Sequence, residues 1–268
     1  MLIISDNLNV RYSHVAEAVE KRDGGSIREL AHKATAAGAD VIDISIGSLY
    51  SGADEIMAWL VAEVQQVSDL PLSLDAHTAE AIIAGAELAK RPPMLNSYSV
   101  QSANPGEVTG TLIPYAAEKG YEIILCTMDP SGPPLDPDVR GSKASELVEA
   151  AMAAGVSAEA IYIDPVVVHL SGGATAQEHA QSVLETMRLL GRVFDPPIKT
   201  VAGVEYLSLG APRELRSPIS RVYLAMLASL GLTAAFVDVT DAEMIRDIRL
   251  IKALRNESLY SVSDAELN

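Results

Sequence analysis

Polar side chains stand at the ends of six short apolar runs in this chain. Each run has the length and composition of a buried strand, and each polar group stands at or just beyond its end. The residues at these ends are Asp6 and Asn9, Asp43 and Ser45, Asp75 and His77, Asn96 and Ser97, Met128 and Asp129, and Asp164 and His169, all polar except Met128. If the runs are neighbouring parallel strands, these groups converge at one edge of the sheet and form a site there.

The chemistry of these residues favours a particular ligand class. Carboxylates and amides buried in a shared mouth need hydrogen-bond partners, because burying a polar group without one is costly. A carboxylate accepts two parallel hydrogen bonds from an aminopyrimidine edge. An asparagine amide both donates and accepts at a ring amide. The pattern therefore predicts a pocket for a flat heterocycle with several N–H donors.

Each of these residues also has a structural interpretation. Asp43 lies inside its apolar run and can satisfy backbone N–H groups of the fold itself. Asp75 and Asp164 can order loops, and Asn96 can be a turn residue. The histidines lack the i, i+4 spacing or the cysteine partners of a zinc site, so we expect no metal. The single cysteine, Cys126, is expected to be a small buried apolar residue rather than a nucleophile.

Eight apolar runs alternate with eight segments of helical periodicity, at a spacing typical of βαβ units. The predicted strands are Leu2–Ile4, Val41–Ile46, Pro71–Leu74, Met94–Asn96, Glu122–Cys126, Ala160–Ile163, Lys199–Ala202 and Ala234–Val237. The predicted helices are Ile27–Ala37, Asp54–Val67, Thr78–Lys90, Gly106–Lys119, Ser142–Ala154, Ala176–Gly191, Ser217–Leu230 and Ala242–Arg255. Glycines such as Gly38 and Gly120 mark helix ends.

This order predicts an α/β protein, a single (β/α)8 TIM barrel that occupies residues 1–268 as one domain. The proline-rich segment 129–138 follows a predicted strand, so we expect a long loop on the active face rather than a domain joint. A doubly wound open sheet is the rival architecture. It usually carries a glycine-rich motif after its first strand, whereas this chain has the glycine-free segment 5–9 there.

Composition narrows the function classes. The 36 acidic and 20 basic residues give a net charge of −16, which repels nucleic acid and anionic lipid. We interpret most of this charge as a solvated surface. The first residues lack the pattern of a signal peptide, and no apolar run is long enough to span a bilayer. The sequence therefore predicts a soluble, cytoplasmic protein that binds neither nucleic acid nor membrane.

The same segments carry a family resemblance. Ala39–Gly47, Pro71–Asp75, Leu95–Ser97, Thr127–Gly132, Tyr162–Pro165 and Lys199–Gly203 occur in the order and spacing of methyltetrahydrofolate:corrinoid protein methyltransferases, as do Arg221–Met226 and Val237–Asp238. This family is a branch of the pterin-binding barrels, which include dihydropteroate synthase and the folate module of cobalamin-dependent methionine synthase. The chain resembles it from the first strand to about residue 256.

The resemblance implies roles for individual residues. Asp75, Asn96 and Asp164 match the residues that bind the pterin ring, and Asn9 matches an amide that lines the pocket. Met128, Asp129, Gly203 and Arg221 lie in matching segments and are expected to bind substrate as well. The resemblance also implies a homodimer, tetrahydrofolate or methyltetrahydrofolate as substrate, and cobalamin carried by a separate corrinoid protein.

Two positions depart from the family pattern. Tyr206 replaces an asparagine that hydrogen-bonds the methyl-bearing nitrogen of the pterin, and Ser45 replaces another asparagine. A tertiary amine leaves poorly unless it is protonated, so this loss removes help with proton transfer. Tyr206, Glu205 or a water held by Ser45 are candidates to replace it, and we expect Tyr206, Ser45 and Asp43 to be the catalytic residues. Methylation of tetrahydrofolate needs an unprotonated nitrogen, so the departures favour that direction.

The sequence thus predicts a methyltransferase that moves a methyl group between a corrinoid protein and tetrahydrofolate. A pterin-binding module without activity is an alternative, because it would keep the ring ligands and lose the catalytic amide. Dihydropteroate synthase is a weaker alternative. Its basic motifs after strands seven and eight are replaced here by Glu205-Tyr206-Leu207 and Phe236-Val237-Asp238.

Overall fold

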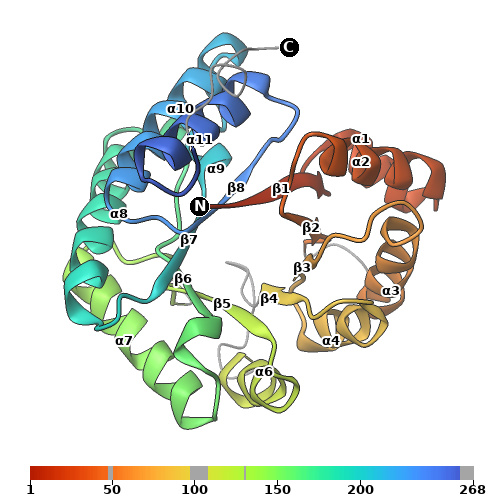
Figure 1. Cartoon of the computed structure of the whole chain (residues 1–268), viewed down its shortest axis with the longest axis horizontal. Helices are drawn as coiled ribbons and strands as arrows, with labels where there is room; N and C mark the ends of the chain where they lie inside the picture. Colours follow the sequence, from red (N-terminus) through yellow and green to blue (C-terminus); the bar gives the residue numbers. More distant parts are fainter. Residues whose placement is uncertain (48–50, 97–107, 130, 260–268) are drawn as a thin grey trace.

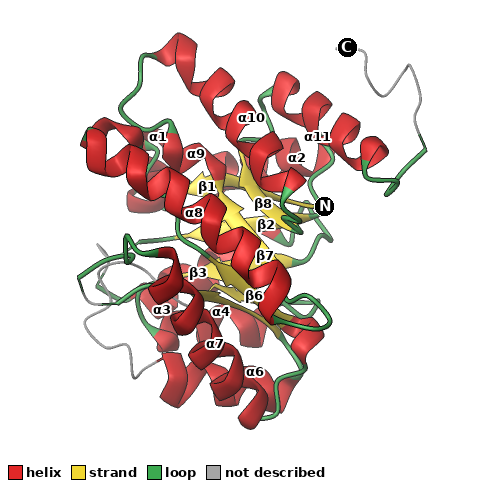
Figure 2. Ribbon diagram, turned by 90° about the vertical axis from the view of Figure 1, so that its left-hand side faces the viewer, coloured by secondary structure: helices red, strands yellow, loops and turns green. Residues whose placement is uncertain are grey.

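The computed structural model describes residues 1–47, 51–96, 108–129 and 131–259, and in it eight parallel strands close into a barrel. The strands run in sequence order around the barrel, and β8 pairs with β1 to close it. Figure 1 looks along the barrel, with the strands in the centre and the helices in a ring around them. Figure 2 shows from the side that the helices cover the outer faces of the strands. The predicted (β/α)8 fold is confirmed.

The strands are β1 (Leu2–Asn9), β2 (Val41–Ser45), β3 (Leu72–Asp75), β4 (Met94–Asn96), β5 (Glu122–Cys126), β6 (Ile161–Asp164), β7 (Lys199–Gly203) and β8 (Ala234–Val237). The helices are α1 (Ser13–Glu20), α2 (Gly24–Ala36), α3 (Ala53–Val64), α4 (Ala79–Leu88), α6 (Ile113–Lys119), α7 (Pro137–Ala153), α8 (Ala174–Val193), α9 (Val204–Leu207), α10 (Arg213–Ser229) and α11 (Ala242–Leu254). Three short turns of helix are η1 (Val108–Leu112), η2 (Ala158–Ala160) and η3 (Leu170–Gly172).

Local signals in the sequence set many of these boundaries. The side chains of Thr78, Asp136 and Asp241 accept hydrogen bonds from backbone N–H groups in the first turns of α4, α7 and α11. Gly38 and Gly120 have the positive φ angles, 88° and 68°, that end a helix. Each predicted strand is present, with its ends shifted by a few residues at most in seven of the eight. The predicted helix Gly106–Lys119 begins outside the described residues, and its described part forms η1 and α6.

The first strand is longer than predicted. Residues 5–9 were expected to follow it, but β1 continues to Asn9 through an irregularity in its pairing with β2. The polar side chains stay in the strand because they find partners inside the barrel rather than in water. The Asn7 amide donates to Asp238 at 2.6 Å and accepts from the Val239 N–H at 3.0 Å, which ties β1 to the end of β8. The helices α1 and α9 were also missed, because both are short.

The strand alternation divides the core in two. Side chains on the outer faces of the strands pack under the helices. The inner faces fill the lower barrel with a cluster of Ile4, Val41, Met94, Ile124, Tyr162, Val201, Ala234 and Phe236. Two residues further along most of these strands, the next inward-facing positions are polar or small. The barrel interior therefore changes from apolar to polar toward the carboxyl ends of the strands.

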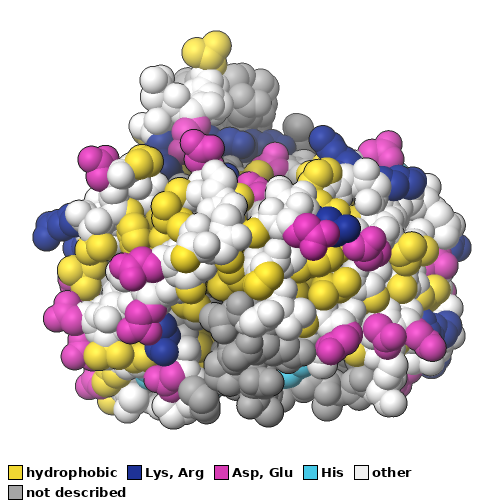
Figure 3. Space-filling model, turned by 90° about the horizontal axis from the view of Figure 1, so that it is seen from below, with side chains coloured by type: hydrophobic (Ala, Val, Ile, Leu, Met, Phe, Trp, Pro, Cys, Tyr) yellow, Lys and Arg dark blue, Asp and Glu magenta, His cyan; other side chains and the backbone are white. Residues whose placement is uncertain are grey.

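The surface matches the charge expected from composition. On the face shown in Figure 3, acidic side chains are spread among basic and apolar ones, as in a solvated surface. None of the helices in the described part of the chain is long and apolar enough to cross a membrane. Within the same residues, no three His, Cys, Asp or Glu side chains are grouped so that they could bind a metal ion.

Candidate functional site

A cavity of about 200 Å³ lies at the carboxyl ends of the strands. Its walls come from most of the barrel, because the inward-facing position near the end of each strand points into the same space. The lining residues are Asp6, Asn9, Asp43, Asp75, Asn96, Cys126, Met128, Asp164, Val166, Val167, Gly203, Tyr206 and Phe236. The cavity combines an apolar floor at Phe236 with polar walls, as in sites for small heterocycles.

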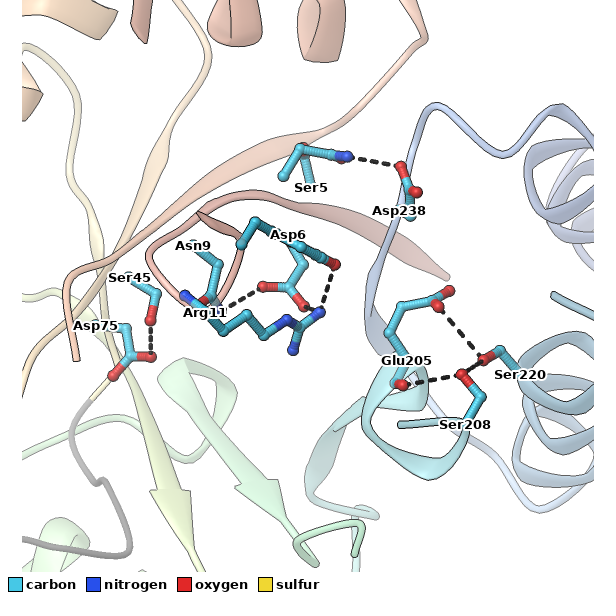
Figure 4. A network of polar contacts seen from close by, with 12 residues as sticks. Ser5, Asp6, Asn9, Arg11, Ser45, Asp75, Glu205, Ser208, Ser220 and Asp238 are labelled. Carbon is cyan, nitrogen blue, oxygen red and sulfur yellow. Dashed lines mark hydrogen bonds and ion pairs between the residues drawn. The ribbon is translucent and has the colours of Figure 1, made fainter. Parts of the chain in front are cut away.

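Asp75, at the end of β3, is oriented by its neighbour on β2. The Ser45 hydroxyl donates a hydrogen bond of 2.7 Å to one carboxylate oxygen of Asp75, and Figure 4 shows this pair at the edge of the cavity. Burial raises the pKa of Asp75 to about 6, although the bond from Ser45 opposes the shift. Asp75 is therefore mostly ionised at neutral pH and accepts hydrogen bonds from N–H donors.

Asp43 lies one layer deeper in the barrel. The Ser73 hydroxyl of β3 donates a hydrogen bond of 2.6 Å to Asp43. The sequence suggested backbone N–H groups as possible partners of Asp43, and the structure adds this side chain. Burial and the nearby Asp75 carboxylate raise the pKa of Asp43 well above its usual range, and hydrogen bonds from Ser73 and Asn96 only partly oppose this. A protonated Asp43 can donate a hydrogen bond as well as accept one.

Asp164, at the end of β6, is held by the loop that follows it. One carboxylate oxygen accepts a hydrogen bond of 2.7 Å from the backbone N–H of Val166, which has a left-handed φ of 62°. Burial raises the pKa of Asp164 to about 6. The positive φ of a β-branched residue costs conformational energy. The loop nevertheless adopts this conformation, in which the Asp164 carboxylate lines the cavity.

Arg140 of α7 fixes the conformation of this loop. Its fully buried guanidinium donates to the backbone carbonyls of Pro134, Pro165 and Val166, the last at 3.2 Å, and to Nδ1 of His179 at 2.8 Å. Burial lowers the pKa of Arg140 to about 10, so it remains a cation at neutral pH. Nothing in the sequence indicated a role for Arg140, because it resembles an ordinary residue in the first turns of a helix.

The opposite wall of the cavity carries a second polar cluster. Asp6 accepts a hydrogen bond of 2.8 Å from Asn9 and forms an ion pair with Arg11, and Figure 4 shows the three side chains together. The guanidinium carbon of Arg11 lies 4.4 Å from the centre of the Tyr206 ring. Asp6 was expected among the polar groups at the strand ends and does line the cavity, whereas Arg11 was not predicted as a site residue.

Tyr206 enters the cavity from α9, directly after β7. It is 39% exposed, and burial of much of the side chain raises the pKa of its hydroxyl above the usual value. Gly203 at the end of β7 leaves space for it, since a Cβ added at Gly203 would lie only 3.0 Å from the Tyr206 ring. A larger residue at position 203 would therefore require the Tyr206 ring to shift by a few tenths of an ångström.

Glu205 was a candidate to replace the missing amide, but the structure directs its carboxylate away from the cavity wall. One oxygen lies 3.4 Å from the Ser220 hydroxyl of α10, which in turn donates to Ser208 at 3.1 Å (Figure 4). Burial raises the pKa of Glu205 to about 7, and the nearby Asp238 acts in the same direction. Glu205 does not belong to the cavity lining.

Most of the predicted site residues are brought together. The cavity is lined by Asn9, Asp43, Asp75, Asn96, Met128, Asp164, Gly203 and Tyr206. Ser45 does not line the cavity, but its hydroxyl donates a hydrogen bond to the Asp75 carboxylate. Ser97, which was expected at the end of the fourth strand, lies outside the described residues. The expectation for Cys126 is corrected in part, since it lines the cavity; burial raises the pKa of its thiol well above the usual range.

Two predicted substrate-binding residues lie elsewhere. Asp129 follows β5, but it is not among the lining residues and its carboxylate accepts from the Ser131 N–H at 2.9 Å within a turn. Arg221 lies on α10, outside the barrel, and pairs with Asp247 at 2.6 Å and Glu243 at 2.9 Å on α11. The structure thus places neither Asp129 nor Arg221 on the cavity lining, because a matching segment does not determine which way a side chain points.

Comparisons of the sequence with known proteins identify its family and its relatives. The sequence model described as "pterin binding enzyme" matches residues 6–238. The chain is 27% identical over 256 residues, 95% of its own length and 91% of the relative's, to a methylcorrinoid:tetrahydrofolate methyltransferase of Eubacterium limosum. It is 24% identical over 242 residues to a methionine synthase of Mycobacterium leprae, covering 88% of this chain and 20% of that protein.

Solved structures show the same barrel. Dihydropteroate synthase of Xanthomonas albilineans with 4-aminobenzoic acid superposes with a TM-score of 0.68 at 20% identity, covering 97% of this chain and 93% of that one. The enzyme of Yersinia pestis with a pterine-sulfa conjugate gives a TM-score of 0.66 at 20% identity, covering 96% and 94%. The match to the family sequence model extends from Asp6 in β1 to Asp238 after β8 and so includes all eight strand ends. The chain therefore belongs to the pterin-binding enzyme family.

Proposed function

We propose that this protein is a methyltransferase that moves a methyl group between a corrinoid protein and tetrahydrofolate, with methyltetrahydrofolate as the favoured product. The observation that carries the proposal is the convergence of Asp75, Asn96 and Asp164 on one cavity at the barrel mouth. The similarity to a methylcorrinoid:tetrahydrofolate methyltransferase supports the choice among the reactions of pterin-binding barrels.

The ionisation of the cavity suits a reduced pterin. At neutral pH Asp75 and Asp164 are mostly ionised, because the pKa of each is about 6, and they accept hydrogen bonds from the amino group and the ring N–H. Asn96 donates to the ring carbonyl and accepts from a ring N–H. Asp43, whose pKa is raised by burial and by the nearby Asp75 carboxylate, forms a hydrogen bond with Asn96. Together these groups fix the ring in one orientation.

The favoured direction of methyl transfer depends on whether the reaction needs a proton donor from the protein. The methylated corrinoid of the partner supplies an electrophilic methyl group. The lone pair of the pterin nitrogen forms the new N–C bond, the methyl–cobalt bond breaks with its electron pair left on cobalt, and the nitrogen releases its proton to water. This direction needs no proton donor from the protein. The reverse direction needs one to make the nitrogen a leaving group, and Tyr206, whose raised pKa keeps its hydroxyl neutral, is a poor acid.

A spectral assay tests the function. Purified protein with tetrahydrofolate and methylcobalamin, under anaerobic conditions, is expected to form cob(I)alamin and methyltetrahydrofolate at a rate proportional to protein concentration. Tetrahydrofolate binding is measured in parallel by calorimetry. Binding without turnover, with cobalamin either free or carried by a corrinoid protein, would instead support a pterin-binding module. The absence of binding would refute both.

Replacing Tyr206 with asparagine tests the proposed direction. Tyr206→Asn restores an amide that can hold a proton near the pterin nitrogen, so we expect the rate of methyltetrahydrofolate demethylation to rise by about tenfold or more relative to methylation of tetrahydrofolate. Tyr206→Phe is the matched control, because it keeps the ring beside Arg11 and adds no amide. An unchanged ratio of the two rates in Tyr206→Asn would contradict this assignment.

We also propose that the protein is a homodimer, as the family resemblance implies. Leu215, Val222 and Met226 lie along one face of α10 and are exposed. A second copy of the chain would remove this apolar face from water. Analytical ultracentrifugation is expected to give the mass of two chains, and Val222→Glu is expected to give single chains. A wild-type protein that sediments as a single chain would refute the dimer.

A further inference from the structure

Val166 combines a β-branched side chain with a left-handed backbone, at a φ angle of 62°. This conformation is unfavourable for any residue with a Cβ atom and most of all for a β-branched one, whereas glycine adopts it freely. In the described part of the chain, the other non-glycine residues with positive φ are Arg22 and Asn256. Both directly follow the end of a helix, where this conformation is common. Val166 lies instead in the loop between β6 and η3, so a helix end does not explain it.

The contacts that hold this loop use only the backbone of Val166. Its N–H donates to the Asp164 carboxylate at 2.7 Å, and its carbonyl accepts from Arg140 at 3.2 Å. Arg140 also donates to the carbonyl of Pro165, the preceding residue. A glycine at position 166 would offer the same N–H and the same carbonyl without the conformational cost. The valine side chain is therefore not needed to fix the loop.

The Val166 side chain does not serve the hydrophobic core either. Its neighbour Val167 is 8% exposed and belongs to the core under the helices. Val166 is only partly buried, and among the described residues it belongs neither to the two core clusters nor to the apolar residues packed against them. It does line the cavity at the barrel mouth. The cavity is thus the place where this side chain can have a role.

The cavity has an apolar wall on the side of β5 and β6. The residues of this wall follow or end those two neighbouring strands and are Cys126, Met128, Val166 and Val167. The N–H and carbonyl groups of a flat heterocycle lie in the plane of the ring, so hydrogen bonds to Asp75, Asn96 and Asp164 occupy its edge. The faces of the ring remain without hydrogen-bond partners. An apolar wall beside Asp164 is suited to cover one of these faces.

We propose that the Val166 side chain packs against one face of the bound pterin ring and sets the affinity of the site for that ring. The proposal rests on the function proposed above and deepens it. The Val166 N–H and the ring edge share the Asp164 carboxylate, which brings the ring and this side chain to the same part of the cavity. A β-branched side chain has few rotamers, so the wall keeps its shape without ligand and loses little entropy on binding. This gain in binding offsets the unfavourable backbone.

The test measures the binding of two ligands that share the ring. Tetrahydrofolate carries an aminobenzoylglutamate tail, whereas 6-methyltetrahydropterin has the same reduced ring without that tail. Dissociation constants are measured anaerobically by calorimetry for wild type, Val166→Gly and Val166→Ala. Both variants remove the two methyl groups of the valine, and we expect each to bind both ligands about tenfold more weakly. Two methyl groups that leave water on binding contribute about this factor.

Thermal unfolding of the ligand-free proteins separates a ligand contact from support of the fold. Val166→Gly is expected to raise the melting temperature by about 2 °C, because glycine relieves the backbone conformation. Val67→Gly is the matched control, since Val67 is exposed in the turn after α3 and has no positive φ. It is expected to lower the melting temperature by about 2 °C, because glycine loses more entropy on folding, and to leave both affinities unchanged.

Several results would overturn the inference. Wild-type affinity in both Val166 variants would exclude a contact with the ligand. A loss in Val166→Gly but not in Val166→Ala would show that only the stiffness of the loop matters. A loss for tetrahydrofolate but not for 6-methyltetrahydropterin would place the contact on the tail. Weaker binding together with a lower melting temperature would assign the side chain to the fold. If wild-type protein binds neither ligand, the proposed function itself falls, and the inference falls with it.

Discussion

Asp75→Asn is expected to weaken tetrahydrofolate binding by about 100-fold at neutral pH and, at the same time, to stabilise the ligand-free protein. The asparagine keeps the shape of the side chain but removes an ionised acceptor and presents an N–H group to the ring donors. Losing charge-assisted hydrogen bonds in a buried site costs about 3 kcal/mol, which corresponds to that change in affinity. Calorimetric titration with tetrahydrofolate measures it.

The stability gain has a defined pH window. Burial raises the pKa of Asp75 in the folded protein from 3.8 to about 6. Its contribution to the free energy of unfolding is therefore greatest below about pH 4 and is lost as the pH rises through about 6. A shift of this size corresponds to roughly 2 to 3 kcal/mol when burial is complete, and partial exposure of Asp75 reduces it to about 1 to 2 kcal/mol. Urea unfolding of ligand-free protein at about pH 7 and about pH 4.5 is expected to show a clearly larger gain of Asp75→Asn at the higher pH.

Asp69→Asn is the control for both measurements. Asp69 lies just before the amino end of β3, so it tests the same substitution at the opposite end of the same strand, where the side chain is exposed. Its affinity and stability are expected to stay close to wild type. Equal affinity in Asp75→Asn and wild type would remove Asp75 from the binding site. A loss of affinity together with a loss of stability at pH 7 would show that the carboxylate supports the fold instead.

Arg140→Met is expected to lower the free energy of unfolding by about 3 to 5 kcal/mol, among the largest effects that a single substitution has. Arg140 is fully buried and donates to the carbonyls of Pro134, Pro165 and Val166. Methionine fills a similar volume but leaves these carbonyls without their donor, and unsatisfied buried acceptors account for the cost. Urea unfolding measures the change.

The same substitution is expected to weaken tetrahydrofolate binding by about tenfold, because the loop that Arg140 fixes also holds Asp164 through the Val166 N–H. Arg188→Met on α8 is the control, since Arg188 is exposed and pairs only with Glu185 among the described residues; it is expected to change stability by less than about 1 kcal/mol. Arg140→Lys keeps a charge and is expected to lose less stability than Arg140→Met. Full stability in both Arg140 variants would show that the carbonyls find other donors.

The barrel could be predicted because its signals are local and repeated. Runs such as Glu122–Cys126 are too short and too apolar for exposed helices, and they alternate with helical segments at regular spacing. Caps such as Asp136 and Asp241 act within one turn of chain, so the sequence itself contains both partners of the interaction. The exception is β1, whose polar end stays in the strand only because Asn7 meets Asp238, more than 200 residues later in the chain.

The candidate site was predicted in outline for a related reason. Strand periodicity placed Asp75, Asn96 and Asp164 at the barrel mouth, and the family resemblance then assigned them to the pterin ring. Arg11 and Arg140 could not be placed in this way, because each lies in a loop or helix and reaches its place through contacts with other elements. Arg221 illustrates the opposite error, since its segment matches the family while its side chain points toward α11.

The sequence by itself determined the barrel, the acidic surface and the ring of polar groups at the strand ends. These depend on composition and on short-range periodicity, which a linear chain contains in full. Only the tertiary structure decided the ionisation and the contacts of these groups. Ser45 donates a hydrogen bond to Asp75 and Ser73 donates one to Asp43, while Arg11 pairs with Asp6 and lies over the Tyr206 ring. Ionisation and hydrogen bonding depend on burial and on the distance between residues that are far apart in sequence, and both arise only when the barrel closes.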